Sequence, residues 1–178
     1  YYQAGYCQYQ LKQYSEAIEQ LELAIKKTPA DQKVSLAQSY LFLGDAESKL
    51  GKQLRENDPE AATQLLTTST QTFTTLLRKF PEFENADQAW YFKGEAFESL
   101  KRYDDAAAAF RKVLDYPDSE FRLEAQYGLG FIYEKNGKYD LAHQHYNEFE
   151  SNGQQHGSFQ EVRFRNGEVL MQLAQAAR

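Results

Sequence analysis

The chain has 178 residues, of which 42% are hydrophobic and 26% charged, a composition typical of a folded domain and not of a disordered chain. Its net charge of −6 lacks the basic excess that nonspecific binding to nucleic acid or to an anionic membrane requires. No apolar run approaches the roughly 20 residues of a transmembrane helix, and no signal peptide is visible. Because the chain starts at Tyr1 and not at methionine, we interpret it as a fragment of a longer protein.

Taken in chain order, the sequence predicts four helix hairpins followed by a single final helix, all within one domain. The repeat units are residues 1–31, 32–82, 83–118, 119–151 and 158–178. The first helix of each unit is expected at about 1–11, 34–52, 84–100, 120–136 and 159–175. The second helices are expected at about 14–27, 59–79, 103–115 and 139–150. The final helix has no second helix after it, so it is either a cap or the start of a further repeat.

Small residues recur at matching positions in these units. The first helices carry a glycine at spacings of 39, 50, 36 and 37 residues: Gly5, Gly44, Gly94, Gly130 and Gly167. Three second helices carry an alanine and, four positions later, a large apolar residue: Ala17 and Leu21, Ala106 and Phe110, Ala142 and Tyr146. Glycine inside a helix costs about 1 kcal/mol relative to alanine. The recurrence therefore indicates close packing of the two helices in a hairpin, for example Gly94 against Ala106.

These motifs resemble the tetratricopeptide repeat, whose pattern W-x2-L-G-x2-Y is matched closely by residues 90–97 and 127–133. The resemblance covers essentially the whole chain. It implies an all-α fold, a right-handed superhelical α-solenoid of stacked antiparallel hairpins. A finer likeness lies in Tyr116-Pro117-Asp118-Ser119-Glu120, which is similar to linkers of bacterial cell-envelope repeat proteins such as the assembly lipoprotein BamD and the Tol-Pal coordinating protein. That likeness favours a bacterial protein and a periplasmic or envelope location over a cytoplasmic one.

The second unit departs from the family because it is about 13 residues too long. Asp58, Pro59 and Glu60 read as a helix N-cap, a first-turn proline and a first-turn acid, so we expect the hairpin to be extended and to project beyond its neighbours. The threonine-rich residues 67–75 have poor helix propensity, and a strand is the alternative. We predict a helix, because the apolar residues around them keep a 3.6-residue period.

The sequence predicts neither catalysis, nor a metal, nor a cofactor. His143 and His145 lie two residues apart, on different faces of a helix, which suits solvated surface better than a shared metal. Glu95 and Glu98 share a helix face, but as a general acid–base pair they would need a pocket and a partner. Cys7 has no neighbouring cation or histidine to activate it, and we expect it to pack.

The resemblance implies instead that the first helices line a concave groove for a peptide or helix of another protein. Side chains three residues before and one and four residues after each glycine should face that groove. These columns include Leu41, Asp45 and Ser48 of the second unit. From them we predict a partner-binding surface of Tyr2, Tyr6, Tyr91, Glu95, Glu98, Tyr127, Phe131, Glu134 and Phe164. Some of these aromatic residues could instead be buried between hairpins.

The predicted surface suggests the kind of partner. Tyrosine and phenylalanine offer large contact areas at low entropic cost, and the carboxylates favour a neutral or basic partner. Chaperone-binding members of the family grip a C-terminal carboxylate with Lys, Arg and Asn at these positions, so we expect no such clamp here. Two alternatives stay open: a structural module that stacks end to end, and a regulatory domain attached to an enzyme elsewhere in the full-length chain.

Overall fold

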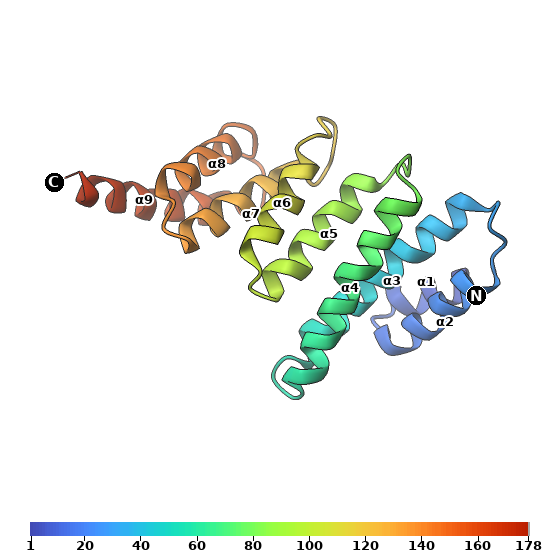
Figure 1. Ribbon diagram of the computed structural model, residues 1–178. Helices are drawn as coiled ribbons and strands as arrows, with labels where there is room; N and C mark the ends of the chain where they lie inside the picture. Colours follow the sequence, from blue (N-terminus) through green and yellow to red (C-terminus); the bar gives the residue numbers. More distant parts are fainter. Residues whose placement is uncertain (178) are drawn as a thin grey trace. The chain divides into compact units, whose positions relative to one another are not determined.

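The computed structural model describes residues 1–177, and within them the chain forms α-helices and no strand (Figure 1). The helices are α1 (Tyr2–Gln10), α2 (Tyr14–Lys27), α3 (Lys33–Leu54), α4 (Pro59–Lys79), α5 (Ala86–Ser99), α6 (Tyr103–Val113), α7 (Arg122–Lys135), α8 (Tyr139–Asn152) and α9 (Phe159–Ala176). Within each compact unit, successive helices run antiparallel as hairpins, so the predicted all-α fold of helix hairpins is confirmed. The helices group into two compact units, residues 1–105 and residues from 106 onward.

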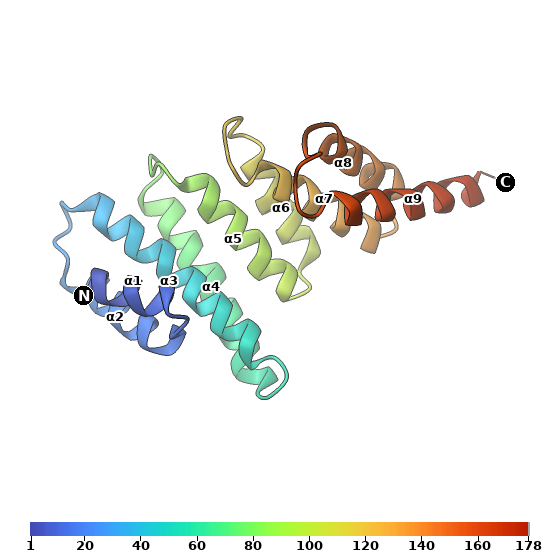
Figure 2. The ribbon, with the colours of Figure 1, turned by 180° about the vertical axis from the view of Figure 1, so that it is seen from behind.

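In the first unit, α3 and α4 form the longest hairpin, with 22 and 21 residues. Figures 1 and 2 show that its turn projects beyond the ends of α2 and α5, as the extra residues predict. Asp58 is the N-cap of α4, and its Oδ1 accepts a hydrogen bond of 3.0 Å from the Ala61 amide. Pro59 occupies the first turn, where the missing amide hydrogen costs nothing. The local sequence therefore sets where α4 begins.

The threonine-rich stretch is helical throughout, which confirms the helix prediction over the strand. Exposed threonines donate their hydroxyls to the backbone carbonyl four residues earlier, for example Thr68 to Gln64 and Thr74 to Thr70. On the opposite face, Phe73 and Leu76 are fully buried in a core cluster with Leu41 of α3 and Ala89 of α5. Burial of this apolar face on α3 and α5 outweighs the weak intrinsic propensity.

The recurring glycines mark where the helices of a hairpin come closest. A Cβ added to Gly5 would lie 2.8 Å from Leu21, and one added to Gly44 would lie 2.9 Å from Phe73. At Gly130 in the second unit, the added atom would overlap the ring of fully buried Tyr146. Each large residue comes from the second helix of the same hairpin, so these glycines let a bulky side chain lie on a helix backbone.

Gly167 of α9 is the exception, because an added Cβ there would have no neighbour within 4 Å. Helix α9 packs on α8 through Val162, Asn166 and Val169, and no second helix covers its glycine face within the described residues. Figure 2 shows the C-terminal half of α9 running past the ends of α7 and α8. Asn166 is buried and donates hydrogen bonds to Asn147 and Glu150 at 2.9 and 2.7 Å.

We predict opposite effects of the same substitution at two glycines of the second unit. Gly130→Ala should lower the free energy of unfolding by about 1–3 kcal/mol, because the new methyl group must displace the Tyr146 ring. Gly167→Ala should raise it by up to about 1 kcal/mol, because the site is open and alanine favours the helix. Urea denaturation of both variants measures these changes in unfolding free energy, and shifts of the same sign would contradict the packing at the two glycines.

A carboxyl group is buried between α3 and α4 of the long hairpin. Glu47 is 3% exposed, and its Oε2 accepts a hydrogen bond of 2.8 Å from the Thr72 hydroxyl. Burial raises the pKa of Glu47 to about 7; the Thr72 hydrogen bond opposes this shift, and the charge of Glu22 on α2 adds to it. The fold therefore favours the protonated form of Glu47.

This carboxyl should make the stability of the first unit depend on pH. Because the folded pKa lies above the ordinary value, its stabilising effect is complete below about pH 4.5 and is lost as pH rises through 7. The loss should be on the order of 2–3 kcal/mol between pH 4.5 and 8. Glu47→Gln keeps an acceptor for Thr72 and should flatten this dependence. Denaturant unfolding at a series of pH values tests it, and equal pH slopes for both proteins would contradict the assignment.

Candidate functional site

An aromatic cluster lies where α1 crosses α3 in the first unit, and we call Tyr2, Tyr6, Tyr9 and Phe42 the α1–α3 cluster. The ring centroid of Phe42 lies 4.8 Å from that of Tyr6, 5.3 Å from that of Tyr9 and 6.3 Å from that of Tyr2. The rings of Tyr2 and Tyr6 are stacked at 6.2 Å. Tyr6 is 36% exposed, and the other three are half-buried. Contacts among the rings hold them in place while leaving part of their area open.

Lys49 of α3 links this cluster to α5. Its Nζ lies 3.4 Å from Oδ1 of Asp45, 6.0 Å from the Tyr9 ring centroid and 5.8 Å from the Phe92 ring centroid. Asp45 is buried and also accepts a short hydrogen bond from the Tyr9 hydroxyl. Burial and the Asp45 charge raise the pKa of Tyr9, so its hydroxyl stays a donor. Aromatic rings and a paired cation therefore lie together on the surface of α1, α3 and α5. We call the surface formed by the α1–α3 cluster, Lys49 and Phe92 the α1–α3–α5 face.

The acidic part of this face lies on α5. Glu95 pairs with Lys52 of α3 at 3.4 Å, whereas Glu98 has no hydrogen bond or ion pair with any described residue. Burial raises the pKa of Glu98, the neighbouring Glu95 raises it further, and Lys52 opposes them. Glu98 is thus a half-buried carboxyl group that forms no ion pair with any cation among the described residues.

In the second unit, α9 supplies cationic and acidic partners to the predicted residues of α7. The Nη1 of Arg165 lies 3.3 Å from Oε1 of Glu134, and its guanidinium lies 5.0 Å from the Phe131 ring centroid. The Tyr127 hydroxyl donates to Glu161 at 2.6 Å, and Glu161 also pairs with Arg165 at 3.2 Å. Burial and the Glu161 hydrogen bond raise the pKa of Tyr127 to about 12. We call these five residues the α7–α9 network.

The predicted site residues therefore fall into separate groups. Tyr2 and Tyr6 lie together in the α1–α3 cluster, and Tyr91, Glu95 and Glu98 lie on α5 of the same unit. Tyr127, Phe131 and Glu134 belong to the second unit, as does Phe164, which is 67% exposed on α9. Tyr91 and Tyr127 are half-buried, so neither is lost to the core. Their role in binding stays a prediction.

Several sequence expectations about individual side chains were wrong. Leu41, Asp45 and Ser48 are buried, because neighbouring helices pack on several sides of α3. The prediction that these three side chains face a groove is therefore wrong for the repeat of residues 32–82. Cys7 is exposed on α1 and does not pack. The histidines are half-buried and not solvated: Nδ1 of His143 lies 2.7 Å from Asn166, and Nδ1 of His145 lies 2.5 Å from Gln126.

Four residues of these surfaces were missed. Phe42, Lys49, Glu161 and Arg165 stand outside the columns chosen around the glycines. The i, i+4 spacings of Asp45 with Lys49 and of Glu161 with Arg165 were a visible signal of ion pairs on one helix face. Within residues 1–177, no three His, Cys, Asp or Glu side chains gather to hold a metal ion. None of the described helices has the length and apolar character needed to cross a membrane.

Comparison with protein families identifies the repeat. One tetratricopeptide repeat profile matches residues 1–31, and a second matches residues 69–121 and 102–156. The chain belongs to the tetratricopeptide repeat family. This family generally mediates contacts between proteins and is typically non-catalytic. A search of curated proteins found no significant relative.

Solved tetratricopeptide repeat structures share the fold. A thermophilic repeat protein of Thermus thermophilus is 19% identical to this chain, with a TM-score of 0.58. The alignment spans 96% of this chain and 97% of the Thermus chain. A putative kinesin light chain of Podospora anserina with nearly identical TPR-like repeats is 18% identical, covers 98% of this chain and 85% of its own, and has a TM-score of 0.64. At these identities the likeness shows the fold alone, and it lends no support to the finer resemblance to bacterial envelope proteins.

Proposed function

We propose that this repeat domain binds a peptide or helix of another protein, with the α1–α3–α5 face of the first unit as the principal surface. The observation that carries the proposal is the α1–α3 cluster, because its rings are fixed by mutual contact and still partly open. Rigid aromatic residues lose little conformational entropy on binding and are frequent hot spots. Tyr91 and Glu98 on α5 would extend the surface.

Ion pairs within the chain reduce the number of charged groups that are free to attract a charged partner. Lys52 already pairs with Glu95, and Arg165 with Glu134, so these carboxylates attract a basic partner less than the sequence suggested. Glu98 has no such partner among the described residues, and a lysine or arginine of the bound segment would compensate its charge. Lys49 and Lys52 are themselves paired, which disfavours a grip on a terminal carboxylate. A largely apolar segment with one basic residue fits this face best.

The test uses random peptides, because these can be selected before the natural partner is identified. Phage-displayed 12-residue peptides selected on the immobilised domain should be enriched in apolar residues with a basic neighbour. Tyr6→Ala should weaken binding of the selected peptides by about 1 kcal/mol or more, as expected for a hot spot. Thr68→Ala, on the exposed face of α4, is the matched control and should leave affinity unchanged. Equal affinities measured by fluorescence anisotropy for wild type and Tyr6→Ala would refute this site.

A second candidate function, self-association, is favoured by the open face of α9. Phe164, Leu170 and Met171 are exposed there beside Gly167, which no described helix covers. Exposed apolar residues grouped on one face are a frequent mark of a contact surface. A second copy of the chain could bury them.

Sedimentation velocity distinguishes this second candidate. If α9 mediates self-association, the sedimentation coefficient should rise with concentration, and Phe164→Asp with Met171→Asp should abolish the rise. Gln160→Asp with Gln172→Asp introduces the same charge at exposed positions of α9 and should leave the rise unchanged. A concentration-independent monomer in the wild type would exclude this function.

A further inference from the structure

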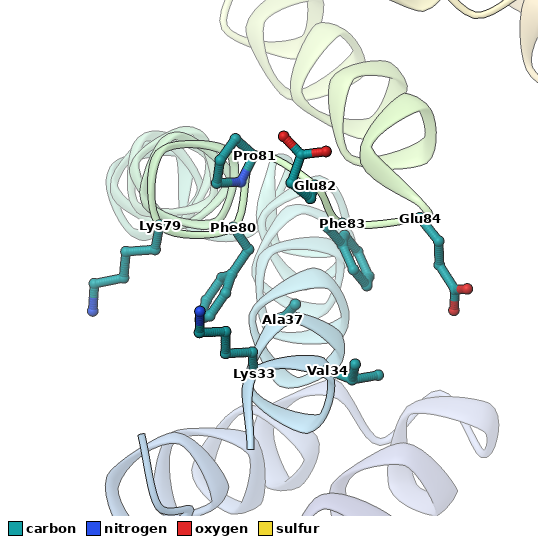
Figure 3. A pocket seen from close by; sticks show the side chains of 9 residues that line it. All are labelled: Lys33, Val34, Ala37, Lys79, Phe80, Pro81, Glu82, Phe83 and Glu84. Carbon is teal, nitrogen blue, oxygen red and sulfur yellow. The ribbon is translucent and has the colours of Figure 1, made fainter. Parts of the chain in front are cut away.

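A pocket of about 370 Å³ opens between the start of α3 and the loop that joins α4 to α5 (Figure 3). It lies within the first unit and contains no residue of the α1–α3 cluster. The residues that line it are Lys33, Val34, Ala37, Lys79, Phe80, Pro81, Glu82, Phe83 and Glu84. Its volume falls in the range of sites that hold a small organic group or a large side chain.

The interior of the pocket is apolar because the chain turns sharply after α4. Helix α4 ends before Phe80 and Pro81, and the Phe83 amide donates to the Phe80 carbonyl at 3.1 Å. Figure 3 shows the rings of Phe80 and Phe83 on either side of Ala37, with Val34 beside Phe83. Val34 is 62% exposed, so an apolar wall remains in contact with solvent. Covering it with an apolar group would be favourable.

Charges of opposite sign stand on the two sides of this apolar wall. Lys33 and Lys79 lie on the Phe80 side, and Glu84 lies on the Phe83 side, with Glu82 to the right of Pro81 in the view of Figure 3. The Lys79 ammonium donates to the Tyr40 hydroxyl at 3.1 Å, a neutral partner that leaves its charge uncompensated. Lys33, Glu82 and Glu84 form no ion pair with any residue between 1 and 177. The pocket thus has an electropositive side and an electronegative side.

We propose that this pocket binds an extended segment of a partner protein through one large apolar side chain. An acidic residue of the segment faces Lys33 and Lys79, and a basic residue faces Glu84. In an extended chain, side chains two positions apart point to the same face. The recognised pattern is therefore acid-x-apolar-x-base, read in either chain direction. A fatty acid would satisfy the lysines but would leave its apolar tail beside Glu84, which disfavours a lipid.

The experiment uses capped nine-residue peptides titrated into the ¹⁵N-labelled domain. The first probe carries Glu-x-Leu-x-Lys, and three others carry Glu-x-Leu-x-Glu, Lys-x-Leu-x-Lys or Glu-x-Gly-x-Lys. The mixed peptide should bind tightest and shift the amide signals of Val34, Ala37 and Phe83. Each like-charge peptide should bind about threefold more weakly, the size expected for an exposed ion pair. Loss of the leucine should weaken binding at least about tenfold.

Charge reversal makes the proposal specific to this pocket. Lys33→Glu with Lys79→Glu should transfer the preference to the Lys-x-Leu-x-Lys peptide. Lys112→Glu with Lys138→Glu changes the net charge equally at exposed positions of the second unit and should keep the original preference. Binding that is unchanged in the pocket variant, or unaffected by loss of the leucine, would overturn the proposal. So would shifts of these amides with decanoate and with none of the peptides.

The proposal does not depend on the proposed function of the α1–α3–α5 face. Tyr6→Ala should leave titration of the mixed peptide unchanged, and Lys33→Glu with Lys79→Glu should leave binding of the phage-selected peptides unchanged. Failure at one surface is thereby distinguished from failure at the other.

Discussion

The packing of the α1–α2, α3–α4 and α7–α8 hairpins depends on how closely the two helices of each hairpin approach at the glycine of the first helix. Leu21, Phe73 and Tyr146 lie on the backbone of Gly5, Gly44 and Gly130, where any side chain would collide with them. The intrinsic cost of glycine in a helix is offset by burial of one large residue per hairpin. At Gly167 the same residue type meets no side chain, so the helix carries that cost without the packing contact.

The long hairpin of α3 and α4 adds a polar contact to this apolar packing. The Ser69 hydroxyl donates a hydrogen bond of 2.7 Å to the Gly44 carbonyl, and the Thr72 hydroxyl donates one to the buried Glu47 carboxyl group. Hydroxyl groups on the buried face of α4 thus form hydrogen bonds to α3, while exposed threonines donate to carbonyls of α4 itself. A carboxyl group whose pKa is raised to about 7 by burial gives this hairpin a pH sensitivity that purely apolar packing would lack.

The sequence predicted the helices and their pairing well because both follow from local patterns. Periodic apolar residues, the glycine–large residue pairs and the Asp58-Pro59 start are each readable within a few residues. Exposure of a given side chain depends on helices distant in the sequence, and predictions of exposure from the local pattern were therefore less accurate. Choosing positions by their spacing from each glycine treated Leu41, Asp45 and Ser48 as equivalent to Tyr2 and Tyr6. Helix α3, however, is packed by neighbouring helices on more sides than α1. Arg165 was missed for the same reason, since its importance arises from the approach of α9 to α7.

The cations on these surfaces change how an acidic repeat domain can recognise another protein. Lys49 lies near two aromatic rings while paired with Asp45, and Arg165 lies over Phe131 while paired with Glu134. Each cation therefore holds an aromatic residue in place and neutralises a carboxylate that would otherwise select for basic partners. The net charge of the domain then predicts little about the charge of the partner that such a face prefers. Among the described residues, Glu98 on α5 and the separated lysines and glutamates around the pocket form no ion pair, so they remain able to attract a charged partner. Discrimination should therefore rest on these few uncompensated charges, set beside apolar surface that is already rigid.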